Sequence, residues 1–121
     1  MTDIQKALLG KKITSFDLVS DGSCITFQIE GGGSVRLRAV GDCCSETWIE
    51  SIDAPEALIG TVSDVGEIDM PSLGNVPTER HQYVDQVDYY GLKITTEKGR
   101  VVLDYRNDSN GYYGGWLEVA P

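Results

Sequence analysis

Two adjacent cysteines beside an aspartate are the residues of this chain with the clearest capacity for chemistry. Asp42, Cys43 and Cys44 precede a strand-like run that contains Trp48 and Glu50. Neighbouring Cα atoms lie about 3.8 Å apart, which is shorter than the usual disulfide separation, so a bridge between the two cysteines would be strained. A reactive thiolate needs a base or a positive environment, and the nearby carboxylates supply neither. We therefore expect reduced cysteines with a structural role.

A metal site or a catalytic pair would need a second group of ligands or a base. The chain has three cysteines and one histidine, His81, without the paired C-x2-C spacing of zinc sites. On a strand Cys43 and Cys44 would point to opposite faces and would not easily hold one ion. An enzyme would need His81 to meet a cysteine in space, and nothing in the sequence indicates that it does. We expect no metal, no cofactor and no catalysis.

Carboxylates are abundant, and three of them share a parity along the strand-like run. Asp42, Glu46 and Glu50 would lie on one face if the strand began early enough. Such a row could bind a cation or a basic partner, although a solvated acidic face is the more common outcome. "EGGGS" lacks the pattern of a phosphate loop and indicates a hairpin turn instead.

The stretch "SNGYYGGW" near the end of the chain combines a turn signal with a group of aromatic residues. Asparagine followed by glycine tolerates positive φ, and the two later glycines allow close backbone approach. Aromatic rings beside glycine and a turn are typical of ligand-stacking or protein-contact patches. The alternative is that alternate rings form core and a cross-strand cluster. We predict a ligand- or partner-binding patch made of Arg100, Arg106, Asn110, Tyr112, Tyr113 and Trp116.

The first third of the chain predicts a short helix and three strands. Residues 2–9 form the helix, because Thr2 and Gln5 have the spacing of a capping box and Gly10 offers a stop. "ITSFDLV", "CITFQIE" and "SVRLRAV" follow, separated by "SDGS" and "GGG". Their apolar residues alternate with polar ones, which indicates an antiparallel sheet with one buried face.

The rest of the chain predicts further strands around one irregular segment. Residues 47–52 read as a strand, 53–60 as a short helical segment with Asp53 as its cap, and "TVSDVGEI" as another strand. Residues 69–80, with two prolines and a glycine, predict an exposed loop. The last third reads as strands separated by a turn at Lys98 and Gly99 and by the "NDSNG" turn.

These elements predict the fold class α+β. We expect a mainly antiparallel, strongly curved sheet or small open barrel of about six or seven strands, with one or two short helices. At 121 residues the chain is expected to form a single domain over 1–121, with a β-rich body from 12 to 119.

Charge and hydropathy restrict the classes of partner. Ten basic and nineteen acidic side chains give a net charge of −9, which argues against extended contact with nucleic acid. It suits a protein that docks on a basic surface, although solubility alone explains it too. Apolar runs of membrane-span or signal length are missing from the sequence, so we expect a cytoplasmic protein without membrane contact. A homo-oligomer is compatible with these numbers.

The chain resembles a family of small, largely uncharacterised domains of bacteriophages and bacteria. The resemblance covers about residues 11–119 and combines two motifs. The residues of the first motif and the short segment after it are Asp42, Cys43, Cys44, Trp48, Ile49, Glu50, Ile52, Leu58, Ile59 and Gly60. Those of the second are Gly99, Val101, Ser109, Asn110, Gly111, Tyr112 and Tyr113. The sequence departs from the pattern at Ser45, where an acid is common, and in its glycine-rich "GGWLEV" ending.

The resemblance implies a small α+β domain of phage or prophage origin and brings no established activity. It implies that Asp42, Cys43, Cys44, Trp48 and Glu50 are a structural signature. We expect a non-enzymatic binding protein, in the host cytoplasm, that inhibits a host antiviral defence protein, such as a nucleic-acid-binding enzyme. One alternative is a sponge that sequesters a small nucleotide signal at the patch that contains Trp116. The second is a structural phage domain.

Overall fold

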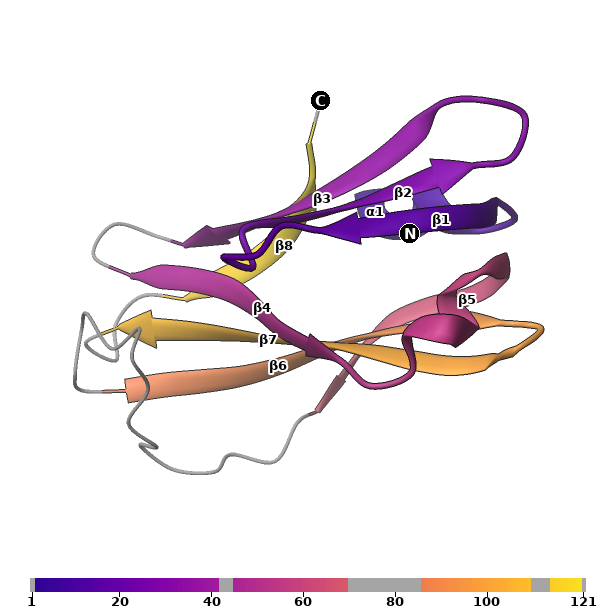
Figure 1. Cartoon of the computed structure of the whole chain (residues 1–121). Coiled ribbons are helices and arrows are strands. Elements are labelled where there is room, and N and C mark those ends of the chain that lie inside the picture. The colour runs from indigo at the N-terminus through magenta and orange to yellow at the C-terminus, as the bar shows by residue number, and fades with distance from the viewer. Residues whose placement is uncertain (1, 42–44, 70–85, 110–113, 121) are drawn as a thin grey trace.

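The computed structural model describes residues 2–41, 45–69, 86–109 and 114–120. In these ranges the chain forms one short helix, one 3-10 turn and eight strands (Figure 1). In chain order these are α1 (Asp3–Leu8), β1 (Lys12–Leu18), β2 (Cys24–Ile29), β3 (Ser34–Gly41), β4 (Glu46–Ile52), η1 (Pro55–Leu58), β5 (Gly60–Asp69), β6 (Gln86–Thr96), β7 (Gly99–Ser109) and β8 (Gly115–Val119).

The strands form one open antiparallel sheet that bends into two layers. Their order is β4-β7-β6-β5-β1-β2-β3-β8, and Figure 1 shows β1, β2, β3 and β8 above β4, β6 and β7. Strand β5 joins the layers, because Gly60 and Thr61 pair with β1, while Val62 and residues 64–69 pair with β6. The edges of the sheet are β4 and β8, each of which has one neighbouring strand.

The sheet has more strands than the six or seven that the sequence predicts. The mainly antiparallel architecture is confirmed, and the described sheet is open rather than closed into a barrel. The two edge strands, β4 and β8, lie in segments that the sequence analysis reads as strands. Their positions at the edges depend on pairing with distant segments, and local sequence does not reveal that pairing.

Local signals place the helix and the hairpins well. Thr2 caps α1, and Gln5 closes the capping box through hydrogen bonds in both directions. The glycines between β2 and β3 all have positive φ, and so does Gly99 between β6 and β7, at 134°. Only glycine adopts these backbone conformations readily, which explains why the turns fall there. No helix in the described part of the chain is long and apolar enough to cross a membrane.

The segment after β4 differs from the expected helix with an Asp53 cap. It is a single 3-10 turn, η1, and the residue before it, Ala54, makes no side-chain cap. Asp53 Oδ1 instead accepts a hydrogen bond of 2.8 Å from the backbone N–H of Val102. The Asp53 carboxylate therefore connects the segment between β4 and η1 to β7. Its partner is the backbone of β7 instead of the backbone of a helix that it would cap.

The core lies between the two layers and follows the period of the strands. Ile25 and Phe27 of β2 and Leu37 of β3 are buried from one layer, and Leu103 and Tyr105 of β7 are buried from the other. Alternate residues of a strand point to the same face, so each strand contributes every second side chain to this cluster.

The outward face of the β4-β7-β6 layer is also partly buried, which the expectation of one buried face did not include. Trp48 is 1% exposed, and Val87 and Val102 are 4% and 7% exposed. None of the three belongs to the core cluster between the layers. Both faces of this layer therefore exclude solvent around Trp48.

Candidate functional site

Several predicted site residues lie outside the described residues. These are Asp42, Cys43, Cys44, His81, Asn110, Tyr112, Tyr113 and residues 70–80 of the expected loop. The described residues that flank the two motifs are register partners. Gly41 pairs with Gly115 between β3 and β8, and Glu46 pairs with Asp108 between β4 and β7. The described residues around positions 42–44 are therefore paired with the described residues around positions 110–113.

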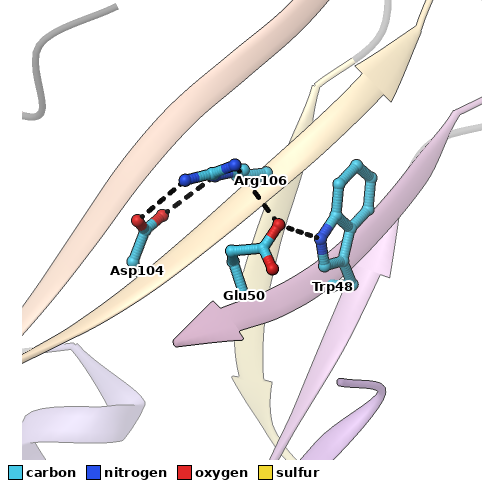
Figure 2. Close-up of polar contacts among 4 residues, drawn as sticks. All are labelled: Trp48, Glu50, Asp104 and Arg106. Atoms are coloured by element: carbon cyan, nitrogen blue, oxygen red, sulfur yellow. Dashed lines mark hydrogen bonds and ion pairs between the residues drawn. The ribbon is translucent and has the colours of Figure 1, made fainter. Parts of the chain in front are cut away.

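Arg106 lies at the centre of a polar cluster on the outward face of the β4-β7-β6 layer. Its register partners are Trp48 on β4 and Tyr89 on β6. Its guanidinium binds Asp104 through Nε at 3.3 Å and Nη2 at 3.2 Å, and binds Glu50 through Nη1 at 3.2 Å (Figure 2). We call Trp48, Glu50, Tyr89, Asp104 and Arg106 the Arg106 cluster.

The Arg106 cluster also contains an aromatic residue from each neighbouring strand, Trp48 from β4 and Tyr89 from β6. Trp48 Nε1 donates to Glu50 Oε1 at 3.4 Å, so one carboxylate oxygen joins the indole and Arg106 (Figure 2). The guanidinium carbon lies 4.8 Å from the centre of the Tyr89 ring, within cation–π distance. Glu50 and Trp48, both expected to be structural, are therefore connected to each other and to Arg106.

The electrostatics of the Arg106 cluster favour a structural role. Burial lowers the pKa of Arg106, but the hydrogen bond and charge of Asp104, with the charge of Glu50, outweigh burial and raise it. One cation faces two carboxylates, and its Nε, Nη1 and Nη2 groups all donate to them. An anionic ligand would have to displace these carboxylates, so the cluster is a cross-strand connection rather than a ready anion site.

The other described residues of the predicted patch lie apart from Arg106. Arg100 is exposed and six residues away on β7, which is about 20 Å along an extended strand. Trp116 is on β8, at the edge of the other layer. The fold therefore does not gather Arg100, Arg106 and Trp116 into one site.

Trp116 instead lines a groove of about 500 Å3 between β8, β5 and α1. Its volume lies within the range of small-molecule and side-chain pockets. The groove has an apolar floor and three carboxylates. Its lining residues are Thr2, Asp3, Ile4, Gln5, Val65, Gly66, Glu67, Leu92, Trp116, Leu117, Glu118 and Val119. We call it the Trp116 groove.

The Trp116 ring is exposed yet held in place. Trp116 is 39% exposed and lies in the unbroken register of β8 with β3. Its Nε1 donates to Glu118 Oε2 at 3.2 Å, and Arg38 holds the same carboxylate through Nε at 2.7 Å and through Nη2. The hydrogen bonds from Arg38 and Trp116 lower the pKa of Glu118. An immobilised aromatic ring loses little conformational freedom when a partner binds it.

Glu67, which belongs to β5 and lines the groove, is held by a residue of the core. It accepts a hydrogen bond of 3.0 Å from the hydroxyl of Tyr105, a buried residue of the core. Burial, and then the charge of Glu67, raise the pKa of Tyr105. Tyr90 stacks on Tyr105 with ring centres 5.1 Å apart. Within the described ranges Glu67 forms no ion pair, and it is one of the residues that line the groove.

Sequence reasoning identified Trp116 but missed the residues that face it. Glu67, Glu118 and Asp3 lie far apart in the chain, and each is an ordinary exposed carboxylate in sequence. They line one groove because α1 packs against both β5 and β8. Long-range packing produces this juxtaposition, and no local pattern marks it.

The described cysteine and carboxylate residues do not form a metal site. Among them no group of three or more His, Cys, Asp and Glu side chains has the arrangement to hold an ion. Cys24 on β2 is a partly buried free thiol.

The profile of a family described as "Domain of unknown function (DUF7448)" matches residues 6–119 of this chain. An uncharacterised protein of Acanthamoeba polyphaga mimivirus is 30% identical over 83 residues, which cover 69% of this chain. The aligned part is 65% of that relative's length, so the chain spans slightly less than two thirds of it. No solved structure matches significantly. The chain therefore belongs to the DUF7448 family of domains of unknown function.

Proposed function

We propose that this domain is a non-enzymatic binding protein that docks on a basic surface of another protein through the Trp116 groove. The observation that carries the proposal is an exposed, immobilised tryptophan that faces carboxylates over an apolar floor. Tryptophan is enriched among the residues that dominate binding energy. Arginine and lysine side chains are the groups that both an indole face and carboxylates attract.

The overall charge supports a basic partner. The net charge of −9 would speed encounter with a positively charged surface and would repel nucleic acid. A viral relative supports a setting in which the partner belongs to the host. We propose that the domain acts in the host cytoplasm and inhibits an antiviral defence protein whose basic surface normally contacts nucleic acid.

The nucleotide sponge has less support from the described residues. The guanidinium of Arg106 already binds Asp104 and Glu50, and Arg100 lies at the far end of β7. The groove beside Trp116 is lined by carboxylates, which repel phosphates.

Affinity capture with matched variants tests the proposed function. The wild type, Trp116→Ala and Glu56→Gln would each be immobilised and exposed to bacterial and amoebal lysates at about 20 mM salt. Glu56 is an exposed carboxylate of η1 outside the groove, so its variant controls for charge. We expect the wild type and Glu56→Gln to retain a basic protein that Trp116→Ala loses, and the purified partner to lose activity when the domain is added.

Two outcomes would contradict this function. One is the absence of any partner whose retention depends on Trp116. The other is a nucleotide that raises the melting temperature, because a ligand at about a hundred times its Kd adds about 2.7 kcal/mol to stability. The second outcome would favour the sponge.

A further inference from the structure

The edge of β8 that faces the Trp116 groove has its backbone groups directed away from β3. The backbone N–H of Ala120 donates to the carbonyl oxygen of Arg36 in β3 at 2.8 Å. The backbone N–H of Ala39 in β3 points the other way and donates to the carbonyl oxygen of Ser23. Peptide groups of successive residues in a strand point to opposite edges. Leu117, the register partner of Ala39, therefore directs its N–H and C=O away from β3, and so does Val119.

Gly115 has the same parity as Leu117, so its backbone groups are directed away from β3 as well. No described strand pairs with this edge of β8. An edge strand with free donors and acceptors is a template for another strand.

The groove runs along this edge rather than over one face of the sheet. Residues 116–119 all line it, although Leu117 is buried toward the core and Trp116 is exposed on the outward side. The opposite wall is formed by Glu67 of β5 and by the first turn of α1. The free edge, the held indole and the Glu67 carboxylate therefore face one space.

We infer that the Trp116 groove binds an extended segment of a partner protein that adds to the edge of β8 and carries arginine or lysine at alternate positions. This inference rests on the proposed function and specifies the partner's chemistry. Directly opposed side chains of neighbouring strands have Cβ atoms about 5 Å apart. A basic residue beside Trp116 reaches the indole face and Glu67, and the intervening apolar residues pack beside Leu117 and Val119.

Charge selects this occupant over a second copy of the chain. Two chains of net charge −9 repel each other, whereas a basic segment is attracted. Glu118 is already paired with Arg38, so the carboxylates of the groove that remain for an incoming cation are Glu67 and Asp3.

A set of three synthetic peptides tests this inference. The parent peptide alternates arginine and valine. In the two other peptides, backbone nitrogens are methylated at either the odd or the even positions, which removes the N–H donors of one strand edge and keeps the charge. Binding to the full chain would be measured by fluorescence polarisation at about 20 mM salt. We expect the parent and one methylated peptide to bind, and the other to bind at least about tenfold more weakly.

Variants of the protein complete the test. Trp116→Ala and Glu67→Gln should each weaken the parent peptide, by about tenfold for the tryptophan, and Glu56→Gln should leave it unchanged. Equal binding of both methylated peptides would show attraction by charge alone and would overturn strand addition. This conclusion would hold even if the lysate experiment captured a partner that depends on Trp116. The inference would also be overturned if the parent peptide did not bind, or if the chain formed a dimer that excluded the peptide. Peptide binding as expected without any captured partner would instead contradict the proposed function.

Discussion

The two tryptophans of the chain lie in opposite surroundings. Trp48 is 1% exposed and joins the Arg106 cluster through Glu50, whereas Trp116 is 39% exposed beside Glu118. Buried aromatic residues contribute to stability through the area that they remove from water, and exposed aromatic residues are available to partners. The first tryptophan is therefore a residue of the fold, and we propose that the second takes part in recognition.

Truncation of each tryptophan should separate these two roles. We expect Trp48→Ala to lower the free energy of unfolding by about 3–5 kcal/mol, because a large buried side chain leaves a cavity. Trp116→Ala should change it by no more than about 0.5 kcal/mol. Urea titration of both variants and the wild type measures the difference. A loss for Trp116→Ala as large as that for Trp48→Ala would place Trp116 in the core and would remove the basis of the groove site.

Tyr105 makes the stability of the fold sensitive to alkaline pH. Burial and the Glu67 charge raise its pKa above the ordinary value of 10.0, so the folded state holds this proton more tightly than the unfolded state does. The stabilisation is complete below about pH 10 and is lost as the pH rises through the folded-state pKa. We expect the urea midpoint of the wild type to fall between about pH 9 and about pH 11.

Tyr105→Phe is the matched variant, because it keeps the ring and removes the titrating hydroxyl. At neutral pH it should cost about 1 kcal/mol through the lost hydrogen bond to Glu67. Its urea midpoint should fall less steeply with pH than that of the wild type. An identical alkaline fall in both proteins would show that other groups cause it.

At the scale of elements, the two layers come into close contact where Gly115 of β8 lies against Thr47 of β4 and Asn107 of β7. A Cβ atom on Gly115 would lie 2.0 Å from Thr47 Oγ1 and 2.8 Å from Asn107 Oδ1. Thr47 and Asn107 are buried and form a hydrogen bond of 2.9 Å. The glycine thus permits the close approach that lets β8 remain beside β3 above this polar pair.

Alanine at each of the two neighbouring glycines should have different effects. We expect Gly115→Ala to lower the free energy of unfolding by about 1–3 kcal/mol through overpacking. Gly114→Ala should change it by less than about 0.5 kcal/mol, because a Cβ atom there meets nothing within 4 Å. Thermal or urea unfolding gives both values.

A double variant identifies the cause of the Gly115 effect. Thr47→Ala removes the hydroxyl that the new methyl group would strike, so it should partly offset Gly115→Ala in a double-mutant cycle. Additive losses in the double variant would mean that the clash with Thr47 is not the cause.

At the scale of the whole molecule, net charge affects stability and binding in opposite directions. Nineteen acidic and ten basic side chains repel one another overall in the compact state. The same excess charge attracts a basic partner over a distance limited by the Debye length. Added salt screens both interactions.

Salt should therefore stabilise the protein and weaken its complexes. We expect the melting temperature to rise between about 20 mM and about 500 mM sodium chloride, while the affinity for the arginine-valine peptide falls by at least about tenfold. Differential scanning calorimetry and fluorescence polarisation measure the two effects. An affinity that does not change with salt would contradict a binding mode based on charge.

The sequence by itself determined what depends on near neighbours. The capping box of α1, the glycine turns before β3 and β7, the alternation of β2 and β7 and the antiparallel class all follow from residues a few positions apart. Tertiary structure decided what depends on distant pairing. It set the order of the strands, the role of Asp53, the ion pairs of Arg106 and the groove that Glu67 and Trp116 both line. The alternation of apolar and polar residues determines the face of the sheet on which a side chain lies, whereas the order of the strands determines which residues that face contacts. Strand order arises from contacts across the whole chain, so it cannot be read from local sequence.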